Sequence, residues 1–166
     1  MAQALFITRE DIVKHTALNG SIDADKFIQF VKIAQDIHLQ NILGTDLFNK
    51  INDDIVGSSL IAPYTTLLTT YIKPMVIHWS MVEYLPFASF TIATKGVYKH
   101  GSENGETAST EDVSKLIEKS RDLAQHYTQR FIDYINYNQS SFPEYNTNSN
   151  GDMFPDRNNN FSGWYL

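Results

Sequence analysis

The side chains that could carry out chemistry are few and widely spaced. The five histidines are His15, His38, His78, His100 and His126. No two of them lie four residues apart and no Glu-x-x-His sequence occurs, so the spacings that place two metal ligands on one helix face are missing. Asp122 and His126 have helical spacing, and a surface pair explains them better than a metal site. The sequence predicts no metal ligands.

Catalytic motifs are missing as well. The chain has neither a phosphate-binding glycine loop nor a G-x-S-x-G sequence, and it has no cysteine that could act as a nucleophile. Glu103 and Glu106 fall in a polar loop, which is a poor support for paired carboxylates. His78 precedes Trp79 in an apolar stretch and is expected to be a core or interface histidine. We therefore expect no enzyme, no catalytic residue and no cofactor, and nothing in the sequence supports a small hydrolase.

Composition restricts the remaining classes of function. The chain has 166 residues, enough for one domain with a core, and its net charge of −6 disfavours a surface that grips nucleic-acid phosphates. The first residues, MAQALFITRED, do not resemble a signal peptide. A long apolar stretch, Ala62–Phe90, contains Lys73, Pro74 and Glu83, so it is expected to be a core helix and not a membrane span.

That stretch is the element around which the other helices are expected to pack. Its apolar residues recur every three or four positions at Tyr64, Leu67, Leu68, Tyr71, Ile72, Met75, Val76, Trp79, Val82 and Leu85. Pro63 suits the first turn and Pro86 marks the end. Pro74 lacks a backbone N–H, so we expect a kink at Tyr71–Lys73 or two helices that meet at an angle.

The flanking segments predict a mainly α fold, a small helical bundle. Three helices are expected before the central one, from Thr8 to about Thr16, from Ser21–Ala24 to Gly44, and from Thr45 to Gly57. The second of these presents Phe27, Phe30, Val31, Ala34, Ile37, His38 and Ile42 on one face. A last helix, capped by Ser109 or Thr110, carries Val113, Leu116, Ile117, Leu123, Ala124, Tyr127, Phe131, Tyr134 and Ile135 on its apolar face.

Two segments do not follow a helical pattern. Residues 90–100 are rich in Thr, Ile, Val and Tyr around Lys95-Gly96, which predicts a short β-hairpin within an arm of about residues 90–109. Residues 139–166 are rich in Asn and Ser yet contain many aromatic residues. We expect residues 1–138 to form the helical domain and residues 139–166 to be an extended tail ordered by a partner, with packing on its own domain as the alternative.

The order of several segments resembles a known group of proteins. These segments are ITREDI (7–12), LQNILGTDLFNKI (39–51), the stretch PYTTLL to YLPF (63–87) and TIATKGVYKHGSENGETAS (91–109). The resemblance is to small proteins of tailed phages and prophages of Bacteroides-type bacteria, which in crAss-like phages look like head–tail connectors. It covers roughly residues 7–137 and does not include the tail from Gln139.

The resemblance implies a structural virion protein of the phage neck, made in the cytoplasm of the bacterial host. Copies of it are expected to form a ring, typically twelve-fold, that joins the portal protein to other neck or tail proteins. DNA would pass through the channel during packaging and ejection without sequence-specific binding, and no membrane is involved. An acidic lining would repel the DNA backbone and let it slide.

Two segments are expected to make the contacts with neighbouring subunits or the portal. The predicted contact residues are Thr91, Ile92, Val97, Tyr98, Phe142, Tyr145, Phe154, Phe161, Trp164, Tyr165 and Leu166. Deletion of residues 139–166 should then leave the helical content nearly intact. The alternative function is a monomeric helical adaptor or regulatory module that binds a protein partner through its C-terminal tail.

Overall fold

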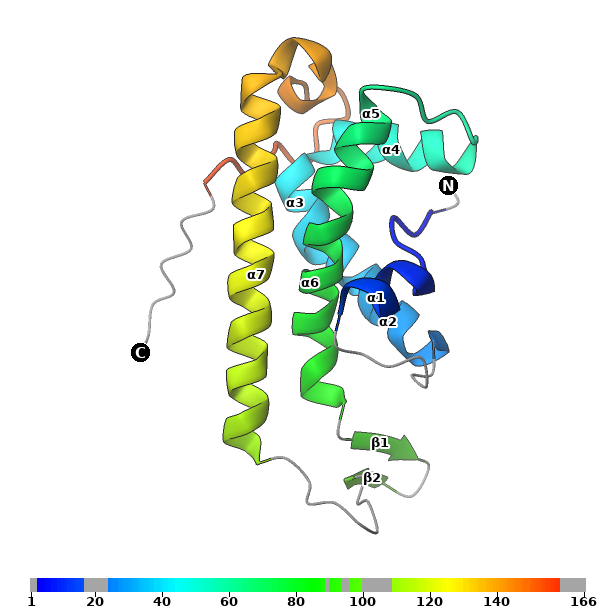
Figure 1. Cartoon of the computed structure of the whole chain (residues 1–166). Helices are drawn as coiled ribbons and strands as arrows, with labels where there is room; N and C mark the ends of the chain where they lie inside the picture. The colour runs from blue at the N-terminus through cyan, green and yellow to red at the C-terminus, as the bar shows by residue number, and fades with distance from the viewer. Residues whose placement is uncertain (1–2, 17–23, 89, 94–95, 100–108, 159–166) are drawn as a thin grey trace.

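The computed structural model describes residues 3–16, 24–88, 90–93, 96–99 and 109–158. Within these residues the fold is mainly helical, as predicted. Figure 1 shows two long helices side by side, α7 (Thr110–Tyr137) and the rod that contains α6 (Lys73–Tyr84). Because α6 also packs against α1 (Arg9–His15) and α2 (Ala24–Ala34), it is the central helix of the bundle. No helix in the described part of the chain has the length and apolarity needed to cross a bilayer.

The central rod absorbs Pro74 without dividing into two helices. It runs through α5 (Tyr64–Thr66), the π-helical segment η2 (Leu67–Ile72) and α6, and ends in the 3₁₀ turn η3 (Leu85–Phe87). The Lys73 N–H bonds to the Leu68 carbonyl, five residues back, and Pro74 follows in the first turn of α6. The expected interruption is therefore a local π-helical segment, a known way to accommodate a disturbance of helical hydrogen bonding.

A second π-helical segment changes which residues of the preceding helix are buried. Residues 24–43 form α2, the π-helical η1 (Gln35–Leu39) and α3 (Gln40–Leu43) in succession. A π-helical turn adds a residue, so the buried face moves on by one position. The prediction that Ile37 lies on the core face is wrong: Ile37 is 52% exposed, while Gln35 and Leu39 are buried.

The ends of the helices follow local sequence signals. Thr8 and Asp11 form the predicted capping box at the start of α1, and Ser109 forms one with Asp112 at the start of α7. Gly44 has a φ of +73°, which lets it end α3 and start α4 (Thr45–Val56) within one residue.

The core lies where these helices meet and includes the N-terminal segment. Its largest fully buried side chains include Phe6, Leu39, Leu43, Leu47, Ile51, Leu67, Ile72, Met75, Phe131, Ile135, Phe142 and Tyr145. Gln35 holds the N-terminal segment in place, because its Oε1 accepts from the Phe6 N–H at 2.8 Å and its Nε2 donates to the Ala4 carbonyl at 3.0 Å. A buried amide with both groups bonded is tolerated in a core.

A two-stranded antiparallel sheet follows the central rod. Strand β1 (Phe90–Ala93) pairs with β2 (Gly96–Lys99), with Phe90 opposite Lys99 and Ala93 opposite Gly96. The pair lies beyond the end of α6, close to the end of the molecule at which α7 begins (Figure 1). Its strands make no extensive contact with any of the described helices.

After α7 the chain reverses and returns along the bundle. The short 3₁₀ turns η4 (Gln139–Ser141) and η5 (Pro143–Asn146) lead into a segment that runs past α4 to Asn158. Backbone hydrogen bonds from Thr45 N to Met153 O, and from Asp156 N to Asn41 O, fix this return. The prediction that the tail needs a partner to become ordered is therefore wrong for residues 139–158, where the alternative of packing on the chain's own domain holds.

Candidate functional site

Asp46, at the start of α4, holds the returning tail. Its Oδ2 accepts hydrogen bonds from the Thr147 hydroxyl at 2.7 Å, the Ser149 N–H at 2.8 Å and the Ser149 hydroxyl at 2.7 Å. The Asn150 amide lies 3.4 Å from Oδ1. These donors, the Ser149 N–H first, lower the pKa of the Asp46 carboxyl, so the carboxylate stays charged near neutral pH although only 8% of the residue is exposed.

The two residues before Asp46 complete this seat, which consists of Gly44, Thr45 and Asp46. The Thr45 N–H donates to the Met153 carbonyl at 3.0 Å, and the Met153 N–H donates back to the Thr45 hydroxyl oxygen at 3.2 Å. Pro155 lies directly on Gly44, where a Cβ would come within 2.7 Å of the proline Cδ. Only glycine fits both this contact and the positive φ, so the seat depends on Gly44 twice.

Two aromatic residues of the tail close the adjoining end of the core. Phe142 and Tyr145 are both fully buried within the chain. Phe142 lies edge-on to Tyr64 with ring centroids 5.4 Å apart, and the Tyr64 hydroxyl donates to Glu144 Oε2 at 2.6 Å. Burial, together with this bond to Glu144, raises the pKa of Tyr64. The prediction that Phe142 and Tyr145 contact a partner is wrong, because both side chains already fill the subunit's own core.

Tyr145 has one unsatisfied group. Its hydroxyl is buried without a hydrogen-bond partner among the described residues, and burial raises its pKa to about 12. Arg157 lies over the ring, 5.0 Å from its centroid, and donates to the Tyr145 carbonyl at 3.2 Å and to Asn146 Oδ1 at 2.8 Å. The arginine thus fixes the last described part of the tail against the residue that closes the core.

A polar and aromatic cluster joins three helical elements deeper in the bundle. His38 of η1 stacks on Trp79 of α6 with centroids 4.0 Å apart, and its Nε2 lies 2.8 Å from Glu83 Oε1. The Trp79 indole N–H donates to Thr128 Oγ1 of α7 at 3.1 Å. A histidine–carboxylate pair can move a proton. Here the two contacts of His38 join η1 to α6, and the Trp79–Thr128 bond joins α6 to α7, so the cluster has an architectural role.

The histidine singled out in the apolar stretch, His78, is half-buried and also faces α7. His78 stacks on Tyr127 of α7 with centroids 5.2 Å apart. Burial, and then the charge of His15, lowers the pKa of His78, which keeps its imidazole neutral near pH 7. His126 lies edge-on to the same tyrosine. Among the described residues no three His, Cys, Asp or Glu side chains gather closely enough to hold a metal ion.

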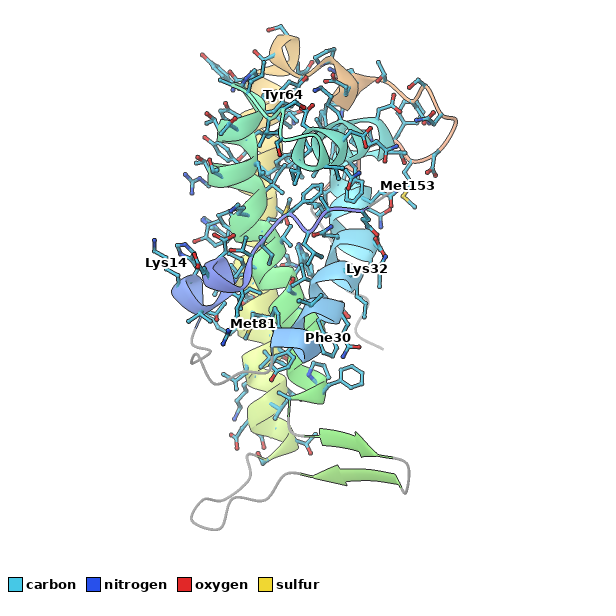
Figure 2. The ribbon with its side chains drawn as sticks, turned by 90° about the vertical axis from the view of Figure 1, so that its right-hand side faces the viewer. Lys14, Phe30, Lys32, Tyr64, Met81 and Met153 are labelled. Carbon is cyan, nitrogen blue, oxygen red and sulfur yellow. The ribbon has the colours of Figure 1, made fainter. Side chains whose placement is uncertain are left out.

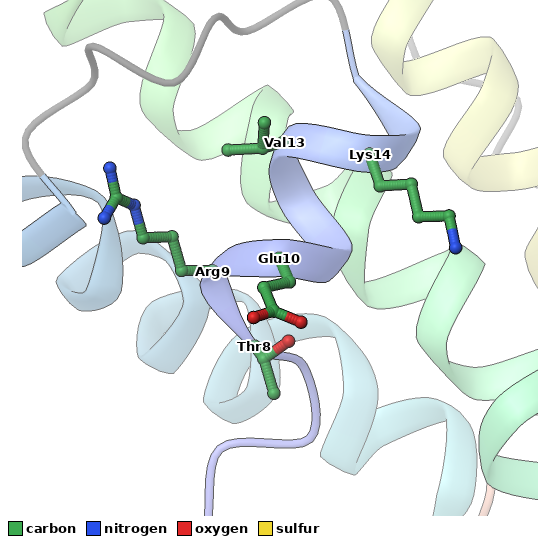
Figure 3. A pocket seen from close by; sticks show the side chains of 5 residues that line it. All are labelled: Thr8, Arg9, Glu10, Val13 and Lys14. Atoms are coloured by element: carbon green, nitrogen blue, oxygen red, sulfur yellow. The ribbon is translucent and has the colours of Figure 1, made fainter.

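One depression opens on the surface of α1. It has a volume of about 720 Å³ and is lined by Thr8, Arg9, Glu10, Val13 and Lys14. Figure 3 shows Arg9 and Lys14 extending in opposite directions, with Glu10 between them beside Thr8. Val13 and the aliphatic stems of the basic residues give the depression apolar surface within a charged border.

The remaining predicted contact residues fall into three groups. Phe154 is 66% exposed and therefore available to another molecule. Thr91, Ile92, Val97 and Tyr98 lie on the paired strands, with Thr91 opposite Tyr98 and Ile92 opposite Val97. Phe161, Trp164, Tyr165 and Leu166 lie outside the described residues.

Sequence reasoning interpreted Gly44, Thr45 and Asp46 only as a boundary between two helices. Their second role needs the tail, which lies about a hundred residues further along the chain. One signal was available: residues 146–150 offer many short polar donors, and such a group is often held by an acceptor elsewhere in the fold.

A comparison with protein families matches a range that contains both the seat and the tail residues that the seat holds. A family of unknown function (DUF6712) matches residues 39–155, from the helix before Gly44 to the proline that packs on it. This range extends past residue 137, where the resemblance stated above ends, and takes in most of the described tail. No curated protein and no solved structure matches the chain. Because the match covers well over half of its residues, the chain belongs to the family of unknown function DUF6712.

Proposed function

We propose that the chain is a structural protein of the neck of tailed phages. Copies of it would form a ring that joins the portal to the tail and leaves a channel through which DNA passes. The resemblance of the segments around LGTDLFNKI and of the 63–109 region supports this assignment. The net charge of −6 is compatible with a channel wall that does not bind the DNA backbone.

The paired strands β1 and β2 carry the proposal. They project beyond α6 and pair with one another, with no extensive contact to a described helix (Figure 1). Two four-residue strands are marginal alone, and in the described part of the chain neither strand pairs with a third along its outer edge. Such an arm is suited to a contact with an adjacent subunit or with the portal, which would cover an edge and stabilise the pair.

The alternative, a monomeric adaptor that binds through its tail, has less support. Residues 139–158 pack on the chain's own helices, and Phe142 and Tyr145 are buried there, so within this range only exposed side chains such as Phe154 are left to reach a partner. We assign to Phe161, Trp164, Tyr165 and Leu166 the anchoring role proposed for the tail.

Phage particles that encode the chain test the assignment directly. Mass spectrometry of purified particles should detect the chain, and cryo-electron microscopy of the neck should place a ring of it beneath the portal. Particles that contain portal protein but lack this chain would refute the proposal.

A second experiment tests the arm. Replacement of Phe90–Lys99 by a short Gly-Ser linker should leave the helical circular dichroism unchanged and abolish incorporation into particles, since the strands contribute little to the helical core. Lys119→Glu, an exposed substitution on α7, is the control and should incorporate normally. Normal incorporation of the linker variant would show that the arm makes no essential contact.

A further inference from the structure

Two surface features lie on opposite sides of the subunit. Figure 2 shows Lys14, on the α1 side, and Met153, in the returning tail, at opposite edges of the molecule. The first side carries the depression described above, and the second carries an exposed apolar pair. A contact between unlike surfaces of two copies leaves one of each surface free, so it can repeat and either close a ring or extend a chain.

The apolar pair, Met153 and Phe154, is held rigidly although it is exposed. Met153 exchanges two hydrogen bonds with Thr45, Pro155 packs on Gly44, and the Asp156 N–H donates to the Asn41 carbonyl at 2.8 Å. An exposed aromatic side chain on a fixed backbone loses little conformational entropy on binding. Such a residue is a common anchor in protein interfaces.

Charges border this pair. The sequence reads Asp152-Met153-Phe154-Pro155-Asp156, and both aspartates are exposed. Asp152 accepts from the Thr45 hydroxyl at 3.0 Å, and Asp156 accepts from the Asn158 N–H at 2.9 Å. Each carboxylate retains further acceptor capacity. We call the segment from Asp152 to Asp156 the acidic knob.

The α1 depression has the complementary character. Val13 contributes apolar surface, while Arg9 and Lys14 extend to either side of it (Figure 3). Lys14 is a basic side chain that the depression offers to a partner, and Glu10 precedes it by four residues on the same helix. The depression, of about 720 Å³, opens to solvent, so a side chain presented by another molecule can reach it.

We infer that the acidic knob of one subunit docks into the α1 depression of a second copy of the chain. Phe154 would enter beside Val13, with Asp156 facing Lys14. This inference deepens the proposed ring function and rests on it for its biological setting. It names the two surfaces of the subunit that meet, which the resemblance does not specify.

Cysteine cross-linking tests the contact with little background, because the natural sequence contains no cysteine. Val13→Cys and Phe154→Cys are prepared as separate full-length variants, mixed and exposed to oxidised glutathione. The mixture should give a disulfide-linked dimer several-fold faster than either variant alone. A mixture of Ile61→Cys with Phe154→Cys measures random collision, since Ile61 is highly exposed. Equal rates in the two mixtures would overturn the inference.

Charge reversal gives an independent measurement by sedimentation. Lys14→Glu and Asp156→Lys should each raise the dissociation constant of self-association roughly tenfold, and the double variant should restore much of it. Lys119→Glu makes the same change of charge on α7 and should have little effect. Absence of self-association in the natural chain, or a double variant no better than the single ones, would also contradict the contact.

The two proposals can fail separately. Detection of the chain in the phage neck without the cross-link between residues 13 and 154 would refute this interface and leave the neck assignment standing. The cross-link in a chain that phage particles do not contain would refute the neck assignment alone.

Discussion

The two ends of α7 differ in how far the apolar face of the helix is buried. In the C-terminal half, Phe131, Ile132 and Ile135 are fully buried, and the returning tail adds Phe142 and Tyr145 above them. In the N-terminal half the apolar face continues in the sequence, but its residue Leu116 is 54% exposed. The first end is closed by the chain itself, and the second lies near the paired strands (Figure 1).

This difference suggests that the closed end of α7 serves the stability of the subunit and the open end serves assembly. Burial of apolar area stabilises the fold by about 25 cal/mol per Å², so the closed end should contribute most of the stability. The open end contributes less to the isolated subunit and has surface to offer to a neighbour. Substitutions at the two ends should therefore differ in their effects on the free energy of unfolding.

Phe142→Ala should give the largest loss at the closed end. Removal of a fully buried aromatic side chain leaves a cavity and typically costs about 3–5 kcal/mol of unfolding free energy. Urea titration followed by circular dichroism measures it. Phe154→Ala, in the same tail but exposed, is the matched control and should change stability by less than about 0.5 kcal/mol. Equal losses in the two variants would show that the tail does not close the core.

The same burial corrects an expectation about truncation. Deletion of residues 139–166 removes Phe142 and Tyr145, so it should destabilise the helices. Truncation after Asn158 removes residues 159–166, which include Phe161, Trp164 and Tyr165, and leaves the seat and the buried Phe142 and Tyr145 in place.

Gly44→Ala should destabilise the protein by about 2–4 kcal/mol, because the methyl group meets Pro155 and the backbone has a positive φ. Gly151→Ala is the comparison for a positive φ without a contact, since Gly151 has a φ of +63° with nothing within 4 Å of the added Cβ. The control should therefore show only the cost of φ, about 1–2 kcal/mol. Thermal unfolding of both variants compares them, and an equal loss would mean that neither the contact with Pro155 nor the extended backbone of Gly44 adds to the cost of a positive φ.

Asp46→Asn should lower the urea midpoint at neutral pH and lose this effect in acid. The folded-state pKa of Asp46 lies below its usual value, so its contribution is complete above about pH 4 and disappears as the pH falls through the lower folded pKa. Midpoints of the natural chain and the variant, measured between neutral and acidic pH, should therefore converge below pH 4. Asp122→Asn, an exposed substitution on α7, should follow the natural chain throughout. A constant gap at all pH values would contradict the role of the carboxylate charge.

Tyr145→Phe should raise the free energy of unfolding by about 1 kcal/mol. The substitution removes a buried hydroxyl that lacks a partner and keeps the ring and its contact with Arg157. Calorimetry measures the gain, and a loss of stability would indicate that the hydroxyl has a partner in the folded protein.

Leu116→Ala should give the smallest effect, within about 0.5 kcal/mol, because more than half of the side chain is already exposed. Ile135→Ala, at the buried end of the same helix, should cost about 2–5 kcal/mol. Chemical denaturation of this pair measures the difference between the two ends of α7 directly. Similar losses would show that both ends are equally covered.

Much of the helical framework was predictable because it depends on local signals. The capping residues Thr8 and Ser109, the glycine at 44 and the three-and-four spacing around α6 each act within a few residues of the chain. The shift of the buried face at Ile37 was not predictable in this way. It follows from a π-helical segment that the spacing of apolar residues does not reveal.

The sequence by itself determined where the helices begin and end, because capping and periodicity are interactions between near neighbours. Tertiary structure alone decided that the tail packs on its own subunit, that Asp46 holds residues 147–150, and that Phe142 belongs to the core. The physical reason is distance along the chain. The sequence pattern of an aromatic residue in a polar segment is the same whether the residue binds a partner or a helix of its own chain. Only the folded structure shows which surface it contacts.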